Sequence, residues 1–374
     1  TNIKSGFDRG YDMNPRGNYF ASRLHTLDDV KIAPAEPGTG YFQTREVANR
    51  AIEFLNDHFE KTPQQPFFGY LAFTAPHFPL HAEPEDIAKY KGAYDKGWNK
   101  IQEERWARMK KAGIIHHDSP QMEREVDPPY PLGQKKLEQF GPGEVDRPIP
   151  WDELTPEQQK VQSAKMSVYA AMVDRMDCEI GRVVELLKEK KQWENTLVLF
   201  MSDNGASAEM MIRDDGHDPK AEMGSAYTYW CPGPGWSSVS NTPLRRHKTW
   251  VHEGGISTPL IVHWPAGIQA KGKLVNTPGH LVDVVPTVLE VTGTEPLKEW
   301  NGKPVPTLAG KSLVPLFGGD VAFERPYLWW SHEGNNALRV GDYKLVKEKK
   351  GDWALYDLSV DRGEQKDLSK EQPE

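Results

Sequence analysis

A polar turn follows one of the most apolar runs of the chain. Thr196 to Met201 is rich in β-branched and large residues, which favours a strand buried on both faces, and Ser202-Asp203-Asn204-Gly205 ends it. Because glycine tolerates a positive φ, we expect a sharp turn at Gly205. Ligands of an open α/β sheet collect beyond the carboxyl ends of its strands, so Asp203 and Asn204 could hold a hard cation through their side-chain oxygens. The alternative is a polar turn that only ends the strand.

A histidine follows a second predicted strand in the same way. The run from Phe67 to Phe73 is apolar, and Thr74-Ala75-Pro76-His77 comes directly after it. Pro76 and Pro79 each fix their own φ, which favours a stiff loop and a well-positioned His77 side chain. An ordinary surface histidine is the alternative. His81, two residues past Pro79, is a weaker candidate.

Positive charge concentrates ahead of a third predicted strand. Arg245-Arg246-His247-Lys248 precedes Glu253-Gly254-Gly255 and the buried strand expected over Pro259 to His263. A basic run is usually a solvated face. This one lies near the edge of the sheet where ligands bind, and there the ammonium of Lys248 can hold an anion as a point charge.

Helices with apolar residues at steps of three and four are predicted around these strands. One covers 45–59, a shorter piece lies near 97–112, and another covers 281–289. A long helix begins at Thr155, with Pro156 at N1 and Gln158 completing a capping box. It leads directly into the strand at 196–201, which is the helix-to-strand half of a crossover in a parallel sheet.

The predicted fold is α/β, with a mixed, mainly parallel central sheet flanked by helices. Short strand-like runs after Gly319 predict a small C-terminal antiparallel sheet, and they cover 327–330, 337–340, 343–346 and 353–358. We therefore divide the chain into a domain over 1–318 and a subdomain over 319–374. Residues 83–150 are charged and proline-rich; they form either an insertion bordering the site or a solvated excursion without a role.

Composition excludes several classes of protein. A net charge of -8 argues against a nucleic-acid partner, and no apolar run approaches the ~20 residues that span a bilayer. The two cysteines, Cys178 and Cys231, allow neither a disulfide framework nor a cysteine zinc site, and Cys178 is expected in the core. The acidic run at 213–218 matches no metal motif and favours a solvated loop.

Five segments, in this order along the chain, resemble type I sulfatases of the alkaline phosphatase superfamily. They are Thr74–Leu80, Ser202–Ala206, Lys248–Gly255 running on into 259–262, His280–Thr287, and Trp353–Leu358 followed by Asp361 and Glu364. Tyr94–Trp98 and Glu104-Arg105 are similar to an insert of bacterial arylsulfatases. The resemblance covers almost the whole chain.

The resemblance implies hydrolysis of a sulfate ester, with a small molecule or a glycan as the organic part. It assigns Asp203 and Asn204 to one calcium site and Lys248 to sulfate binding. It assigns His77 to sulfate contact and to protonation of the leaving oxygen. His252 and His332 are further candidates for contact with the substrate. The fold it implies is alkaline phosphatase-like, and it favours a periplasmic or secreted location.

Three parts of the family's site are not found in the sequence. These are the Cys/Ser-x-Pro-x-Arg motif whose first residue becomes formylglycine, an Asp-Asp pair that supplies calcium ligands, and a Gly-Lys-Trp-His type segment. In the family all three precede the segment that Gly6-Phe7-Asp8 resembles. Cys231-Pro232-Gly233-Pro234-Gly235 is not the motif, because glycine stands at its third and fifth positions. Thr1–Lys4 does not open a signal peptide.

We therefore expect a chain that begins after the nucleophile region, with an incomplete calcium site and little turnover by itself. Two alternatives stay open. One is a phosphate or phosphonate ester hydrolase of the same superfamily. The other is an inert protein that keeps a pocket for sulfate or a glycan. The oligomeric state is left open.

Overall fold

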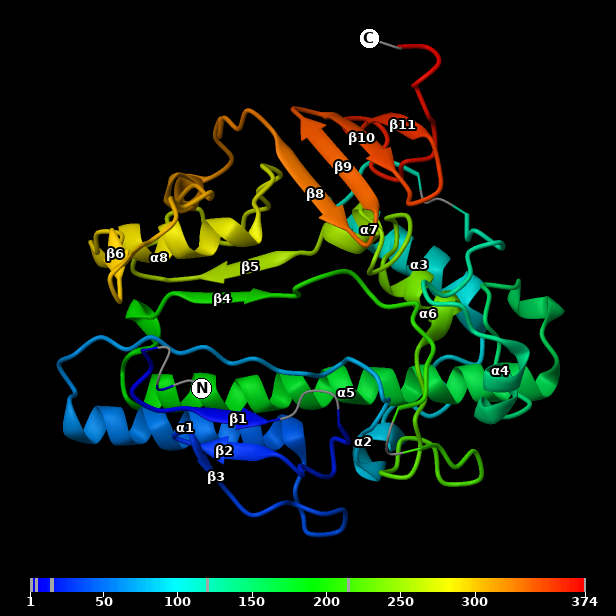
Figure 1. Ribbon diagram of the computed structural model, residues 1–374, viewed down its shortest axis with the longest axis horizontal. Coiled ribbons are helices and arrows are strands. Elements are labelled where there is room, and N and C mark those ends of the chain that lie inside the picture. The colour runs from blue at the N-terminus through cyan, green and yellow to red at the C-terminus, as the bar shows by residue number, and fades with distance from the viewer. Residues whose placement is uncertain (1–2, 4–5, 14–16, 119–120, 214–215, 373–374) are drawn as a thin grey trace.

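Two long helices lie side by side in the lower half of the view in Figure 1. The computed structural model describes residues 3, 6–13, 17–118, 121–213 and 216–372. The helices are α1 (Gln43–Lys61) and α5 (Pro156–Glu189), and both predicted helices are confirmed. The capping box of α5 is formed as expected: the backbone N–H of Gln158 donates to Thr155 Oγ1 (3.3 Å), and that of Thr155 donates to Gln158 Oε1 (2.9 Å).

Residues 83–150 are built into the core. They contain α2 (Pro84–Ala88), α3 (Gly97–Lys111) and α4 (Gln134–Phe140), and the short 3₁₀ helix η2 (Trp151–Glu153) follows. Trp98 is fully buried against Trp151 and against Trp236 of α6 (Gly233–Ser240). The carboxylate of Glu144 and the ammonium of Lys165 on α5 are both buried and 2.7 Å apart. A buried ion pair and a buried tryptophan rule out a merely solvated excursion.

The C-terminal antiparallel sheet is confirmed. Its four strands are β8 (Leu328–His332), β9 (Asn335–Val340), β10 (Tyr343–Lys347) and β11 (Trp353–Asp357), in the order β11-β10-β9-β8. The N-terminal part of the chain contains a small sheet of β1 (Tyr11–Met13), β2 (His25–Leu27) and β3 (Val30–Lys31). A hairpin of β6 (Glu299–Trp300) and β7 (Lys303–Pro304) lies between the two. The domain boundary at 318 stays a prediction.

The strand after α5 is paired differently from the prediction. The short helix η3 (Trp193–Asn195) leads into β4 (Val198–Met201), which pairs antiparallel with β5 (Leu260–His263). Every strand pair among the described residues is antiparallel, so the expectation of a parallel partner for β4 is wrong within this part of the chain.

The strand predicted over Phe67–Phe73 is not formed. The segment runs as extended chain between β4 and α5 in the view of Figure 1, and the side chains of Phe68 and Tyr70 are 66% and 75% exposed. An apolar run becomes a strand only when a neighbouring strand accepts its backbone hydrogen bonds, and no such partner lies among the described residues.

Short helices connect the remaining elements. They are α7 (Glu253–Ile256), η4 (Leu281–Asp283), α8 (Val284–Thr292) and η5 (Val314–Gly318). The amphipathic pattern of 281–289 does form a helix, but Leu281 and Val285 are exposed. Cys178 on α5 is also exposed, so its predicted place in the core is wrong. No helix in the described residues is long and apolar enough to cross a membrane.

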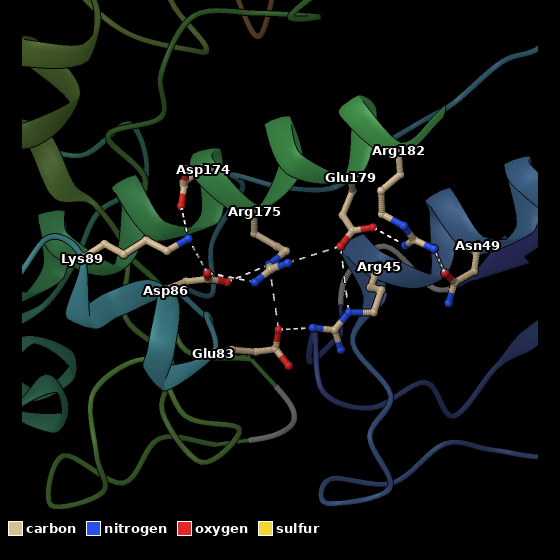
Figure 2. Close-up of polar contacts among 9 residues, drawn as sticks. All are labelled: Arg45, Asn49, Glu83, Asp86, Lys89, Asp174, Arg175, Glu179 and Arg182. Carbon is tan, nitrogen blue, oxygen red and sulfur yellow. Dashed lines mark hydrogen bonds and ion pairs between the residues drawn. The ribbon is translucent and has the colours of Figure 1, made fainter. Parts of the chain in front are cut away.

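A network of charged side chains joins α1 and α2 to α5 (Figure 2). Arg175 of α5 binds the buried Asp86 of α2 with two hydrogen bonds, of 2.7 and 2.9 Å. It also lies 3.5 Å from the buried Glu179, which pairs with Arg182 at 2.5 Å. Burial by itself raises the pKa of Asp86, but the hydrogen bonds from Arg175 and Lys89 outweigh it and lower that pKa below its usual value. The network therefore depends on Arg175.

We predict that Arg175→Met lowers the free energy of unfolding by about 3 kcal/mol, because it leaves two buried carboxylates short of a partner. Lys188→Met on the same helix is the control. Lys188 pairs with the exposed Glu185 and lies over the ring of Trp193, so its loss should cost less than about 1 kcal/mol. Urea unfolding measures both, and equal losses would contradict the central role of Arg175.

Candidate active site

The turn after β4 lies directly against the segment that carries Lys248. The backbone N–H of Gly205 donates to Gly255 O (3.0 Å), and that of Lys248 donates to Ala206 O (3.0 Å). The Asp203 turn and the backbone of Lys248 therefore lie at the same end of β4.

Glycine at 205 is required by close packing. A Cβ atom there would lie 1.7 Å from Gly254 O, and Gly205 does not have a positive φ. The expected reason, freedom to adopt a left-handed turn, is therefore wrong. On the other side of the contact, a Cβ on Gly254 would lie 2.3 Å from the carbonyl oxygens of Arg245 and Arg246. The three backbone segments pack without intervening side chains.

The loop around His77 is held by the core. Phe78 and Leu80 are buried, and the backbone N–H of Leu80 donates to Trp230 O (2.9 Å). The Tyr19 hydroxyl donates to His77 O (2.8 Å). The loop is therefore fixed although the strand expected before it is not formed.

The structure brings His77 and Lys248 together. Lys248 Nζ lies 3.5 Å from His77 Nε2, across 171 positions of sequence, and 3.4 Å from Glu209 Oε1. Glu209 is buried. Glu209 belongs to no sequence motif and was not predicted as a site residue. Only its place in the loop after the Asp203 turn connects it with the site.

His77 is uncharged at neutral pH. Burial, the main cause, and the nearby Lys248 and Arg213 lower its pKa, although Glu209 and the carbonyl of Phe78 act in the opposite sense. His77 Nδ1 lies 2.6 Å from Phe78 O. Because a carbonyl oxygen only accepts, Nδ1 carries the proton, and the lone pair of Nε2 faces the ammonium of Lys248. The cations around a neutral imidazole form a place where an anion would be attracted.

The C-terminal sheet fixes the helix α7, which directly follows the Lys248 segment. Lys344 of β10 is fully buried, and its Nζ lies 2.9 Å from both Glu253 and Glu364. Burial and the adjacent Glu253 carboxylate raise the pKa of Glu364 to about 7. Burial also acts to raise the pKa of Glu253, but Lys344 and Arg362 outweigh it and lower that pKa to about 2. One ammonium thus joins α7 to the C-terminal sheet.

The other candidate histidines lie away from the Lys248–His77 contact. His81 is buried; its Nε2–H donates to Thr228 O (2.7 Å), and its Nδ1 accepts the Tyr19 N–H (3.3 Å). His332 is exposed on β8. His252 is buried on the side facing the C-terminal sheet. Part of the acidic run, Asp214 and Asp215, lies outside the described residues.

The turn after β4 offers few ligands for a metal. The Asp203 side chain is exposed and makes no hydrogen bond or ion pair to the described residues, and the Asn204 amide N–H donates to Gly205 O, which leaves Oδ1 free. Oxygen donors suit calcium, but calcium takes about six to eight of them. Across the described residues no group of three His, Cys, Asp or Glu side chains could hold a metal ion. The donor type fits calcium, and the donor number does not.

Comparison with protein families decides the relationship. The sulfatase family model matches residues 4–294, and a model described as N-sulphoglucosamine sulphohydrolase, C-terminal, matches residues 246–374. This chain belongs to the sulfatase family. It is 37% identical to an arylsulfatase of Klebsiella aerogenes over 275 residues, which cover 70% of the chain and 54% of the relative. It is 31% identical to an uncharacterized sulfatase of Schizosaccharomyces pombe, over 99% of the chain and 68% of the relative. The chain thus spans 54% and 68% of the lengths of these two relatives.

Solved structures show the same fold. The crystal structure of Ps i-CgsB aligns with a TM-score of 0.61 at 22% identity, over 99% of this chain and 64% of that one. A structure in complex with its substrate D-glucosamine-2-N,6-O-disulfate aligns with a TM-score of 0.60 at 18% identity. The alignment covers 97% of this chain and 72% of that one. The fold class is therefore confirmed as alkaline phosphatase-like α/β with a C-terminal antiparallel sheet.

We predict that Gly205→Ala destabilises the protein by about 3 kcal/mol, because the new methyl group would overlap the Gly254 carbonyl and push the Asp203 turn away from the Lys248 segment. Gly181→Ala in α5 is the control. Nothing lies within 4 Å of a Cβ at Gly181, so alanine should stabilise the helix by up to about 1 kcal/mol. Denaturant unfolding distinguishes the two, and a neutral Gly205→Ala would contradict the close contact.

A second prediction concerns pH. Burial lowers the pKa of His81 to about 4 in the folded protein. In the unfolded chain the pKa of a histidine is ~6.5. Between pH 6.5 and pH 4, roughly, the unfolded state therefore binds more protons than the folded state, and the free energy of unfolding falls as the pH drops. His81→Gln should reduce the slope of unfolding free energy near pH 5 by up to about 1.4 kcal/mol per pH unit. His116→Gln, which replaces an exposed histidine, is the control. Equal slopes in all three proteins would show that His81 is not held neutral.

Proposed function

We propose that this protein binds the sulfate group of a sulfate ester between His77 and Lys248 and takes part in its hydrolysis. The observation that carries the proposal is the 3.5 Å approach of Lys248 Nζ to His77 Nε2 beside the Asp203 turn, in a member of the sulfatase family. The ammonium of Lys248 offsets negative charge on the sulfuryl oxygens.

In this proposal, His77 donates a proton to the leaving group. It is neutral in the free protein, and the charge of a bound sulfate would raise its pKa, because a nearby anion favours the imidazolium form. A proton on Nε2 could then pass to the departing oxygen. Glu209, buried beside Lys248, orients the ammonium.

Asp203 and Asn204 would contribute two oxygen ligands to a calcium ion. When bound, such an ion offsets charge on the sulfuryl group. With so few donors, we expect the calcium affinity of the 374-residue chain to be weak.

The organic part of the substrate is proposed to be a glycan or a small aryl group. The first choice is supported by the sulfated sugar in the structure aligned above, and the second by the arylsulfatase relative. A phosphonate monoester hydrolase of Agrobacterium radiobacter aligns at a TM-score of 0.50 with 20% identity, so phosphonate esters are the alternative.

Binding of inorganic sulfate to the 374-residue chain, measured by calorimetry, tests the proposal. We expect Lys248→Met to weaken sulfate binding at least about tenfold, because a charge-assisted hydrogen bond is lost. Lys271→Met, on an exposed lysine outside the site, should change nothing. Equal affinity in the two variants would overturn the assignment, and tighter binding of phenylphosphonate than of sulfate would favour the alternative.

Turnover is a separate prediction. The 374 residues contain no Cys/Ser-x-Pro-x-Arg segment, so we expect negligible hydrolysis of 4-nitrophenyl sulfate by this chain, with or without calcium. Calcium-dependent turnover near the enzyme median of about 10 per second would contradict this expectation and would place the nucleophile within the chain.

A further inference from the structure

A cavity of about 540 Å³ lies between the Lys248 segment and the C-terminal sheet. One wall is formed by Thr249, Trp250 and His252, and the other by the ends of β9, β10 and β11 with the turns that join them. Figure 1 shows the C-terminal sheet above α7, whose first residue follows His252. We call this space the C-terminal cavity. Its volume is within the range of small-molecule sites.

The C-terminal cavity has an unsatisfied polar group in its wall. His252 is 3% exposed, and its Nδ1 has no hydrogen-bond partner among the described residues. Thr249 is 9% exposed, and its hydroxyl interacts with that of Tyr130, which donates to Glu333 (2.9 Å). Buried polar atoms in folded proteins are almost always paired with protein, water or ligand. The unpaired Nδ1 of His252 therefore points to a polar occupant.

Thr249 has an unusual backbone. Its φ is 89°, in the left-handed region, which is a genuine outlier for a β-branched residue. Its carbonyl is held by the Asn335 side-chain N–H (3.1 Å). Glycine or asparagine would adopt this conformation at lower cost, so a threonine here indicates a use for its side chain. That side chain lines the C-terminal cavity, while the preceding residue, Lys248, reaches His77.

The chemistry of the walls favours an uncharged ligand with both apolar and hydroxylated faces. The charged side chains balance: Arg245, Lys349 and Lys350 are opposed by Glu333, Glu348 and Asp352. The rings of Trp250 and Tyr356, with Val346 and Ala354, supply apolar surface. A pyranose ring has an apolar face and a rim of hydroxyls, and it matches this combination. A single water, at ~30 Å³, would fill little of the volume.

We propose that the C-terminal cavity binds a neutral sugar residue, with His252 and Thr249 pairing its hydroxyls. The inference rests on the proposed function in one respect: the sugar is taken to be part of the organic group of the sulfate ester bound beside Lys248. The C-terminal sheet then selects the substrate, and the Lys248–His77 pair binds its sulfate.

The test is ligand-detected NMR of the 374-residue chain with unsulfated N-acetyl-D-glucosamine, D-galactose and lactose. We expect saturable binding of at least one of them in the millimolar range or tighter, not displaced by inorganic sulfate. His252→Phe keeps the volume of the ring and removes its nitrogens, so it should weaken binding about three- to tenfold, the effect of one lost hydrogen bond.

His263→Phe is the matched control. His263 on β5 also has a buried, unpartnered ring nitrogen, and it stacks on Trp193 away from the C-terminal cavity. The substitution His263→Phe should leave sugar binding unchanged. If His252→Phe fails to fold, Trp250→Leu provides the second measurement, because it removes an aromatic wall of the cavity and should weaken binding.

Three results would overturn the inference: no saturable sugar binding, equal effects of His252→Phe and His263→Phe, or displacement of the sugar by sulfate. Binding of 4-methylphenol in place of every sugar would also overturn it and would assign the cavity to an aryl group. None of these results bears on sulfate binding at Lys248, which is measured separately with inorganic sulfate. Failure of the two proposals can therefore be distinguished.

Discussion

The buried ammonium of Lys344 is the interaction on which the candidate site depends. It lies at the centre of the contact between α7 and the C-terminal sheet, 2.9 Å from Glu253 and from Glu364. A charge removed from water is tolerated only when it is paired and hydrogen-bonded, so these three residues fix the position of α7 against the sheet. The Glu364 carboxylate also accepts the backbone N–H of Glu253 (2.7 Å), which ties the start of α7 to the C-terminal tail. The segment carrying Lys248 enters α7 directly.

Close backbone packing fixes the same segment from the opposite side. The Gly205 turn touches Gly254, and Gly254 in turn touches the carbonyls of Arg245 and Arg246. No side chain intervenes, so a shift of the turn after β4 would displace the segment that carries Lys248. The ammonium is thus positioned by rigid backbone on one side and by a buried ion cluster on the other. The same construction leaves the C-terminal cavity beside Thr249, so the two proposed binding sites would share this one short segment.

The charges around His77 are arranged for an anion. Lys248 and Arg213 surround an imidazole that burial keeps neutral, and Glu209 balances only part of this positive charge. An arriving sulfate would therefore find cations already in place, without the cost of reorganising them. It would also change the protonation of His77 in the direction that a proton donor needs. In the proposed function, anion binding and proton transfer would be linked through this one histidine.

The sequence determined the helices and the C-terminal sheet, because these depend on local patterns. The capping box at Thr155 starts α5 where expected, and alternating short apolar runs became β8 to β11. It also indicated His77 and Lys248, each beside an apolar run, and their order along the chain matched a known family. Pairing between distant segments was not determined in this way. An apolar run at 67–73 does not specify its own partner, so a predicted strand was absent and β4 was antiparallel to β5.

Only the tertiary structure identified Glu209, Glu253, Lys344 and the C-terminal cavity. A buried carboxylate and an exposed one look the same in a sequence, since burial depends on what the rest of the chain places around them. The role of Gly205 shows the same limit. Its identity suggested a positive φ, whereas the reason for glycine was a carbonyl 49 positions away that leaves no space for a Cβ atom. Residue types determined which chemistry was available, and long-range packing decided which residues meet.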